Sequence, residues 1–585
     1  MKLSRRAFIE GAASLAAAGL LGSQVLADGE APAAEGPGSA EGPGGEGDPG
    51  SAEGSGGGGP MMQSAGIEDP NWREAPNPDD FEIAGEYDCD VLVLGCGYAG
   101  SACMRKAAVM GKKVIGVDQQ FEEFYNVFGG DVGIINSQVQ KGFGIPEVDP
   151  VEYMNNWQMC CANRAEPDLL KYFAYHSGEA FDFYVEPIGE EGRAKLQPLT
   201  WEGIPEEWNS QLGAFHTYPG AISIKIYGSS QVPLDNIHDA CDNYGAQMLW
   251  GHVAEVLLKD EEGRVTGAIV CNQDDDCYYK INASVGVVVG CGDFSANTTM
   301  FKELIPEIME SNPNTESPSG NGRTGMGQKL CYWAGGAFEI GPRAGMGGVS
   351  GNPMGVWQGT HILLLDKDGY RFCNEAFAHN FVAGIPAQRR ESGLCSVWGS
   401  NFRDTVARMP VGHLNLGDFT QLEKDAAIFN ADAEDSGPDG FTYGRTTVYC
   451  AHDLATLASY CGYEGEAAEQ FVASVERYNE LAAAGVDADY GKPSEVLFPI
   501  EPPYFAAYSG MGGGAGVLVT LAGMFTDRNC QVRAQKTFKP IPGLFAIGNC
   551  CGGRFPLQYT SPINGVSIAW AITSGYQAGE YLGSL

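Results

Sequence analysis

Basic residues are scarce in this chain. Its 585 residues include 36 Lys and Arg against 74 Asp and Glu, which gives a formal net charge of -38 and a pI near 4.4. Nucleic acids and anionic membranes are bound by basic surfaces, and no basic stripe interrupts the acidity of this sequence. The composition therefore argues against both as partners.

The sequence also lacks the spacing of a zinc site and the C-x-x-C-H segment of a haem attachment site. Its 17 cysteines are an odd number, so at least one is unpaired unless it pairs with another chain or holds a cofactor. We expect most of them to pack as small buried side chains, with disulfides or an iron-sulfur cluster as the alternatives. No metal site is predicted.

The first 27 residues have the features of an export signal. Arg5 and Arg6 precede a mild apolar run that contains Gly and Ser and ends in small residues near Ala27. This order is typical of a twin-arginine signal peptide, and an ordinary secretory signal or short anchor is the alternative. The run is too short and too rich in glycine for a good membrane span. We therefore expect an extracytoplasmic protein of the cell envelope or periplasm, with no transmembrane span after signal removal.

Residues 28–70 are expected to form a flexible linker. The segment PGSAEG occurs at Pro37 and again at Pro49, and GSGGGGP follows. Such a composition cannot bury a core. The rest of the chain, from about Asn71, is long enough for one large core or two to three domains.

A dinucleotide-binding fingerprint opens the folded part. The apolar run Asp90–Leu94 leads into Gly95, Gly97 and Gly100. A helical segment comes next, and a second strand after it ends at Asp118. Gly95 permits a tight turn, Gly97 lets a pyrophosphate approach the backbone, and Gly100 packs the helix on the strand. The helix N-terminus faces the phosphates, and the acid can bind a ribose hydroxyl. The pattern predicts a bound dinucleotide, NAD or FAD, and a purely structural glycine turn is the alternative.

Several segments farther along the chain carry a family resemblance. They are GGDVGIINS at 129–137, a strand pair in VAEVLLKDEEGRVTGAIV, CGDFSAN at 291–297, TGMG at 324–327, LLDKDGYRFCNE at 364–375 and IPGLFAIGNCCGG at 541–553. In this order, over about residues 87–585, they resemble the flavoprotein subunits of fumarate reductase and succinate dehydrogenase, the FAD-binding 2 type. The resemblance implies FAD as the cofactor.

The fold that this resemblance implies is α/β. A doubly wound, Rossmann-like FAD-binding domain is expected in two parts, residues 87–300 and 451–585, with an inserted α+β capping domain at residues 301–450. The capping domain is expected to close over the isoalloxazine, so the active site is predicted at the interface.

The expected cofactor-binding residues belong to the fingerprint, the second glycine loop and the later family segments. Gly565–Ser567 precede an apolar helix, whose free amides could stabilise the anionic edge of reduced flavin. The full set is Gly95, Gly97, Tyr98, Ala99, Gly100, Asp118, Gly129, Gly130, Val253, Asp293, Asn549, Gly565, Val566 and Ser567.

The residues that hold fumarate in the family are not retained here. The arginine that protonates the substrate in fumarate reductases falls at His379, and the carboxylate-binding histidine falls at Val519. A second carboxylate-binding arginine should fall within YTSPING, whose polar reactive residues are Tyr559 and Ser561. Fumarate is therefore not the expected substrate. The tail GRFPLQYTSPING also resembles, over a short stretch, the C-terminal segment of 3-ketosteroid Δ1-dehydrogenases.

The leading hypothesis is an exported FAD enzyme that reduces an activated C=C bond of an enoate or enone. Hydride would pass from the flavin to the β carbon while an acid protonates the α carbon. His379 is the candidate proton donor, Tyr559 the candidate for carbonyl polarisation or proton delivery, and Arg554 or Arg343 a candidate for a remaining carboxylate. Each could instead have a structural role.

Electrons must come from outside the chain, because the sequence shows no second redox module. We expect a quinol-linked or exported carrier, as in an anaerobic respiratory terminal reductase, or a route through the vicinal cysteine pairs Cys160–Cys161 and Cys550–Cys551. Three alternatives remain: a dehydrogenase of the steroid type, a flavin electron carrier without its own substrate, and a structural exported protein.

Overall fold

The computed structural model describes residues 67–199, 218, 220–306, 323–346, 362–375, 394–401, 432–443, 446–509, 519–556, 559 and 562–585. The predicted signal peptide, most of the predicted linker, His379 and Ser561 lie outside the described residues. The described chain begins at Ile67, whose N–H donates to the carbonyl of Ala296 at 2.8 Å.

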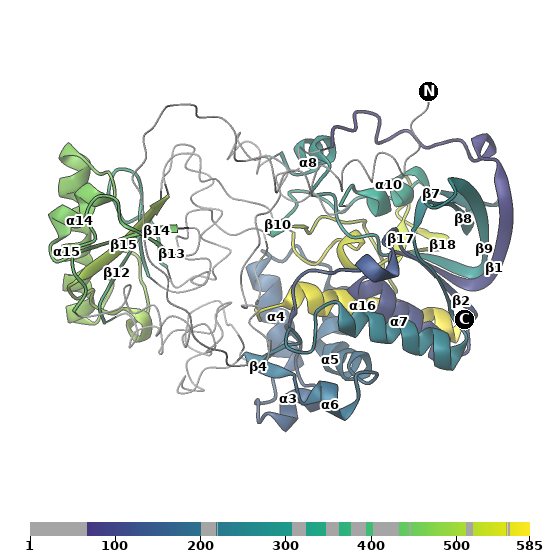
Figure 1. The fold of residues 1–585 in the computed structure, drawn as a ribbon, viewed down its shortest axis with the longest axis horizontal. Coiled ribbons are helices and arrows are strands. Elements are labelled where there is room, and N and C mark those ends of the chain that lie inside the picture. The colour runs from purple at the N-terminus through teal and green to yellow at the C-terminus, as the bar shows by residue number, and fades with distance from the viewer. Residues whose placement is uncertain are drawn as a thin grey trace, which may run out of the picture.

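The larger unit of the molecule is built around a mostly parallel sheet (Figure 1). The strand order is β17-β18-β9-β1-β2-β6. The strands are β1 (Ile83–Leu94), β2 (Val114–Val117), β6 (Gln247–Leu249), β9 (Cys277–Val289), β17 (Gln531–Arg533) and β18 (Pro540–Ala546). β1 pairs in parallel with both β2 and β9, and its last residues are fully buried. A strand buried on both faces needs a continuous apolar run, so the predicted α/β fold is confirmed.

Two helices cover one side of this sheet and pack closely on each other. Helix α2 (Tyr98–Val109) follows β1, and helix α16 (Val566–Ser584) ends the chain. A Cβ on Gly575 would lie 2.0 Å from the carbonyl oxygen of Ala99, so only glycine allows the two backbones to come this near. The C-terminal helix is thereby fixed against the glycine-rich start of the fold.

A hairpin extends the sheet beside β9. β7 (His252–Lys259) and β8 (Val265–Asn272) pair antiparallel, and β8 continues antiparallel onto β9. The strand pair expected within VAEVLLKDEEGRVTGAIV is thereby confirmed. His252 N–H donates to the carbonyl of Asp118 at 2.9 Å, so the hairpin starts at the end of β2.

Shorter elements complete the larger unit. Its helices include α3 (Gln138–Gly142), α4 (Pro150–Cys160), α5 (Pro167–Tyr184), α6 (Gly189–Arg193), α7 (Gln231–Tyr244), α8 (Thr298–Leu304) and α10 (Met326–Trp333). Its small strands are β3 (Asp131–Val132), β4 (Gln197–Leu199) and β5 (Ala221–Ser223) in one sheet, and β10 (Gly345–Met346) with β16 (Val519–Thr520) in another. Single turns of 3-10 helix are η1 (Pro78–Asp80), η2 (Glu122–Phe124) and η7 (Gly548–Cys550).

A smaller unit has its own sheet and core. The antiparallel order is β11-β12-β15-β14-β13, formed by β11 (Leu363–Leu365), β12 (Leu394–Gly399), β13 (Phe441–Tyr443), β14 (Thr446–Ala451) and β15 (Tyr504–Ser509). Helices α14 (Leu454–Tyr460) and α15 (Gly465–Ala484) and the turn η6 (Ser494–Val496) complete it. Because β15 lies between β12 and β14, residues 451–509 pack with this unit, and the boundary expected at residue 450 is corrected to the region after β15.

The cysteines form no disulfide: all 17 are described and carry free thiols. Within the described part of the chain, no group of three or more His, Cys, Asp or Glu residues could hold a metal ion. No helix among the same residues is long and apolar enough to cross a membrane.

Candidate cofactor and active site

The glycine fingerprint forms a tight turn between β1 and α2. Gly95 has φ +84, a conformation that disfavours side chains, and a Cβ there would lie 2.7 Å from Cys291 Cα. A Cβ on Gly100 would lie 1.9 Å from the carbonyl oxygen of Gly95. The helix therefore packs directly on the turn, as the spacing predicts.

Gly97 differs from these two glycines because none of the described residues crowds it. A Cβ there would meet only Val127 Cγ1, at 3.8 Å. Gly97 is the N-cap of α2, and the first amides of a helix, here those of Tyr98, Ala99 and Gly100, lack carbonyl partners within it. Open space over a helix N-terminus suits a phosphate group.

Asp118 is held at the end of β2 beside this turn. Its carboxylate accepts from the N–H of Cys96 at 2.8 Å and from the N–H of Gln120 at 2.9 Å. Burial raises the pKa of Asp118, while the two N–H donors act in the opposite direction. Val253, the second residue of β7, follows the contact between His252 and Asp118. The adenosine half of a dinucleotide would thus find the predicted acid next to the helix N-terminus.

The second glycine loop meets the N-terminus of α16. Gly129 and Gly130 have φ +90 and +154, and a Cβ on Gly129 would lie 2.5 Å from Ile568 Cδ1. A Cβ on Gly565, the N-cap of α16, would lie 2.0 Å from the carbonyl oxygen of Asp131. The structure therefore brings this loop together with Gly565 and with Val566 and Ser567, both buried.

Asp131 is a residue at this junction that sequence reasoning missed. Its Oδ2 accepts from Lys225 Nζ at 2.8 Å, whereas its Oδ1 is buried and has no hydrogen-bond partner among the described residues. A buried acceptor without a donor is costly unless a ligand or water satisfies it. The signal was available, because Asp131 directly follows Gly129 and Gly130.

Two further predicted residues lie at the ends of β9 and β18. Asn549 is in η7, and a Cβ on its neighbour Gly548 would lie 3.0 Å from Ala99 Cβ, which places η7 against the first turn of α2. Asp293 follows β9, and its Oδ1 accepts from the N–H groups of Ser295 at 2.8 Å and Thr520 at 3.2 Å. Asp293 therefore ties the turn after β9 to β16.

Arg554 is fully buried in the described structure. Its guanidinium donates to the carbonyl of Gly548 at 2.9 Å and to Oδ1 of Asn549. Burial lowers the pKa of Arg554 to about 10, so the group is still charged at neutral pH. A substrate carboxylate could reach it only if the surrounding residues moved apart.

Arg343 and Tyr559 occupy different surroundings. Arg343 donates to the carbonyls of Glu339 at 2.8 Å and of Leu304 at 3.2 Å. Tyr559 is buried, and its ring packs edge-on to Phe555 with centroids 4.8 Å apart. The Arg554 guanidinium lies 5.5 Å from the centroid of the same Phe555 ring, so Tyr559 and Arg554 share one aromatic neighbour.

The buried carboxylate of Glu339 was also missed by sequence reasoning, and no motif marks it. It accepts from the N–H of Gly523 at 2.9 Å and from the N–H of Gly553 at 2.6 Å. Burial raises the pKa of Glu339, opposed by these N–H donors and by the charges of Arg343 and Arg554. Glu339 fixes the segment after η7 on the segment after β16.

The vicinal cysteines point to different neighbours. Cys550 Sγ donates to the carbonyl of Gly292 at 3.2 Å. Cys551 Sγ lies 3.3 Å from Thr526 Oγ1 and also contacts the thiol of Cys530. Cys161 Sγ donates to the carbonyl of Arg554 at 3.7 Å. These contacts give no support to electron transfer through vicinal disulfides.

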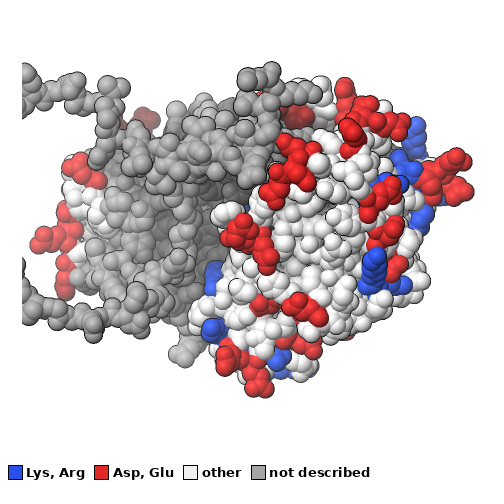
Figure 2. Space-filling view, turned by 45° about the vertical axis from the view of Figure 1, so that its right-hand side comes forward, with Lys and Arg blue, Asp and Glu red and all other residues white. Residues whose placement is uncertain are grey.

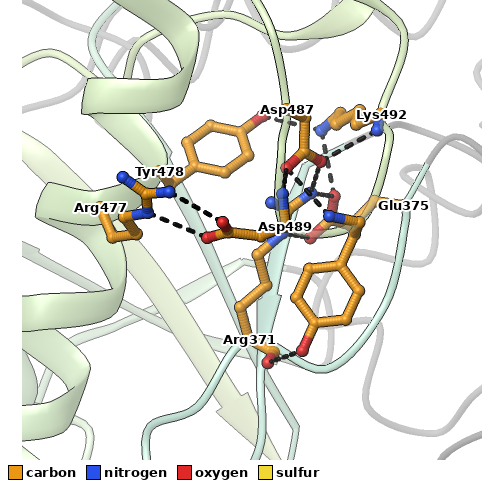
Figure 3. Close-up of polar contacts among 8 residues, drawn as sticks. Arg371, Glu375, Arg477, Tyr478, Asp487, Asp489 and Lys492 are labelled. Carbon is orange, nitrogen blue, oxygen red and sulfur yellow. Dashed lines mark hydrogen bonds and ion pairs between the residues drawn. The ribbon is translucent and has the colours of Figure 1, made fainter.

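A buried charge cluster organises the smaller unit (Figure 3). Arg371 donates to both oxygens of Glu375, each at 2.9 Å, and to Asp487 at 2.8 Å. Lys492 lies 3.4 Å from Glu375 and donates to the Tyr478 hydroxyl at 2.7 Å. Two cations balance two carboxylates, so the cluster is neutral and anchors the RFCNE segment to the loop after α15.

The described cradle therefore has the parts that a flavin dinucleotide requires. The helix N-terminus at Gly97 suits the pyrophosphate, Asp118 suits a ribose, and the loop at Gly130 meets the N-terminus of α16 at Gly565. The unsatisfied oxygen of Asp131 can accept from a ligand hydroxyl. The residues present fit FAD.

Comparisons with known proteins agree with this geometry. A family model described as "FAD binding domain" matches residues 90–566. The digoxin reductase of Eggerthella lenta is 22% identical over 87% of this chain and 89% of its own length. The fumarate reductase (cytochrome) of Shewanella frigidimarina is 25% identical over 84% of this chain and 76% of its own.

A solved structure shares the fold. The 3-ketosteroid-Δ4-(5α)-dehydrogenase of Rhodococcus jostii RHA1 superposes with a TM-score of 0.63 at 18% identity, covering 87% of this chain and 99% of that one.

Proposed function

Because this chain belongs to the FAD-binding domain family, as the match to residues 90–566 shows, we propose that it is an exported reductase of an activated C=C bond in an enoate or enone. FAD is its cofactor, and it is an oxidoreductase whose relatives include reductases that act on C=C bonds. The proposal rests on the FAD cradle, together with the similarity of this chain to a digoxin reductase and a fumarate reductase.

Bound FAD supplies a hydride donor once it is reduced. The chain's own part is to hold this cofactor between α2 and α16 and to direct the free amides at Gly565–Ser567 toward the charge that develops on reduction. His379 is proposed to donate the proton, and Tyr559 to polarise the carbonyl or relay a proton. These roles require both side chains to reach the substrate.

The substrate is proposed to be an enone or a mono-anionic enoate. Val519, which stands where the family has a carboxylate-binding histidine, is an apolar residue of β16. Arg554 is buried and already bonded to Gly548 and Asn549. Arg343 donates to main-chain carbonyls, so any substrate carboxylate would have to compete with them. A two-carboxylate substrate therefore lacks support.

Export and a respiratory role belong to the same proposal. The twin arginines Arg5 and Arg6 support export of the folded, cofactor-loaded protein. The described surface in Figure 2 carries more acidic than basic side chains, in keeping with the net charge of -38. An acidic surface favours a basic electron carrier as the donor.

A single-turnover experiment tests the chemistry directly. The FAD-loaded protein is reduced without air and mixed with enones, mono-anionic enoates or fumarate, and the return of oxidised-flavin absorbance is followed. We expect rapid reoxidation by at least one enone or enoate and a saturated product. Equal rates with and without every alkene would refute the proposal. For export, an Arg5→Lys, Arg6→Lys double variant should leave the protein in the cytoplasmic fraction.

A dehydrogenase of the steroid type is the second candidate. A solved structure that superposes over 99% of its length is a ketosteroid dehydrogenase. This candidate predicts that the protein works faster as a dehydrogenase than as a reductase. Its rate of dye reduction with a saturated ketone should exceed its rate of reduced-dye oxidation with the matching enone.

A further inference from the structure

We propose that Arg554 is a positioning residue for the cofactor: it fixes the side-chain amide of Asn549 so that the Nδ2 group donates to an oxygen in the phosphate and ribityl part of FAD. Two observations carry this inference. One is the chemistry of the contact between the two side chains, and the other is the position of Asn549 beside the start of α2.

The contact determines which way the amide faces. A guanidinium has only donors and no acceptor, and Arg554 NH2 donates to the side chain of Asn549. The Asn549 atom that faces Arg554 must therefore be the oxygen, and Nδ2 must point away from it. Among the described residues Nδ2 has no hydrogen-bond partner, and Asn549 is only partly buried. The donor is thus free to meet a ligand.

The place of Asn549 identifies that ligand. A Cβ on its neighbour Gly548 would lie 3.0 Å from the Cβ of Ala99, the second residue of α2. The α2 N-terminus is the expected pyrophosphate site. η7 packs against the first turn of α2, so a free amide donor on η7 lies close to the acceptor oxygens that the phosphate and ribityl groups of a dinucleotide bound there would supply.

Arg554 is well suited to hold the amide still. Its NH1 donates to the carbonyl of Gly548 at 2.9 Å, so one guanidinium spans both residues that carry the contact. The Arg554 carbonyl accepts from Trp157 Nε1 at 2.9 Å, and Gln328 Nε2 donates to the Asn549 carbonyl at 3.2 Å. Both ends of the segment are fixed, so little rotamer entropy remains to be lost when the cofactor binds.

The test is a double-mutant cycle on the rate at which the holoenzyme releases FAD. Asn549→Ala should speed release by roughly 2- to 12-fold, the effect of one lost hydrogen bond. Arg554→Met should speed it by a similar factor, because the amide is no longer oriented. In the double variant the rate should not exceed the faster single variant by more than about twofold, because both changes remove one and the same contact.

Arg343→Met is the matched control. Arg343 is another arginine of the larger unit, and it donates to the main-chain carbonyls of Glu339 and Leu304 rather than to Asn549. Its effect, if any, should multiply with that of Asn549→Ala. Thermal unfolding at saturating FAD is measured in parallel, because a purely structural role would lower the melting temperature without coupling to residue 549.

Two results would overturn the proposal. One is an unchanged release rate in Arg554→Met, and the other is a double variant whose rate equals the product of the single effects. If Arg554→Met does not fold, Arg554→Lys carries the test: a lysine can donate to Asn549 but cannot span both acceptors, so it should release FAD at an intermediate rate. That intermediate rate should depend on Asn549, and its persistence in Asn549→Ala would contradict the proposal.

Discussion

Replacing Gly97 by alanine should separate cofactor binding from folding. Among the residues that the structure describes, a Cβ at this position meets only Val127, at 3.8 Å, and the backbone at Gly97, with φ -67, is extended. Alanine can adopt this negative φ without the strain of a left-handed backbone. The protein without cofactor should therefore keep its stability, or gain up to about 1 kcal/mol from the smaller entropy of the unfolded chain.

The same methyl group occupies the space through which a pyrophosphate must approach the α2 N-terminus. Forcing an extra carbon into a filled contact typically costs about 1–3 kcal/mol, which corresponds to a roughly 5- to 150-fold weaker affinity for FAD. The assay is a fluorescence titration of FAD, together with urea unfolding of the deflavinated protein. An unchanged FAD affinity, or a loss of stability that fully explains a weaker one, would refute this account of the fingerprint.

Four other predictions concern glycine packing, the buried charge cluster, the proposed proton donor and the free thiols. Gly100→Ala places a Cβ 1.9 Å from the carbonyl of Gly95, so it should destabilise the fold by about 1–3 kcal/mol or more. Gly142→Ala, whose Cβ would have no described neighbour within 4 Å, should be tolerated in the same urea titration. Asp487→Asn removes a buried carboxylate partner of Arg371 and should cost about 3–5 kcal/mol in unfolding free energy. The pKa of Asp487 is lowered to about 2, below its value of about 3.9 in the unfolded chain. Its contribution to the unfolding free energy is therefore present above pH ~4 and is lost as the pH falls toward 2. The unfolding free energies of wild type and variant, measured against pH, should converge there. His379→Gln should leave FAD bound and reduce turnover at least ~10-fold, and unchanged turnover would remove this histidine from the mechanism. Titration of the denatured, non-reduced protein with a thiol reagent should count 17 free thiols, and a lower count would reveal a disulfide.

The fingerprint could be predicted because its constraints are local. Gly95 has a positive φ and Gly100 packs on the Gly95 carbonyl, and both features are set within one turn, although Gly95 also lies against Cys291, which is distant in the chain. The strands on either side of α2 follow the expected order. The hairpin β7–β8 was predictable for the same reason. A backbone position that has a positive φ, or that touches another backbone segment within about ten residues, requires glycine, so it can be recognised in the sequence.

The limits of the smaller unit could not be predicted in this way. β15 lies between β12 and β14 although about a hundred residues separate it from β12. The local sequence of Tyr504–Ser509 does not show which strands it will join. The helices α14 and α15, which precede β15 in the chain, pack in the core of the same unit.

The site shows a similar division. Asn549 and Gly565 could be assigned to the cradle from the resemblance, but the burial of Arg554 could not, because the groups that cover it come from several distant segments, including α4 and α16. An arginine near a predicted flavin strand suggests a substrate carboxylate from sequence alone. Its actual partners, Gly548 and Asn549, became visible only in the fold.

Anaerobic oxidation of a chemically reduced viologen by the purified FAD-loaded protein tests the central claim most directly. Fumarate, urocanate, aryl acrylates and steroid enones are supplied in parallel, with protein lacking FAD as the control. The account predicts alkene-dependent oxidation with an enone or a mono-anionic enoate and little with fumarate. No oxidation with any alkene, while FAD is bound and reducible, would contradict it.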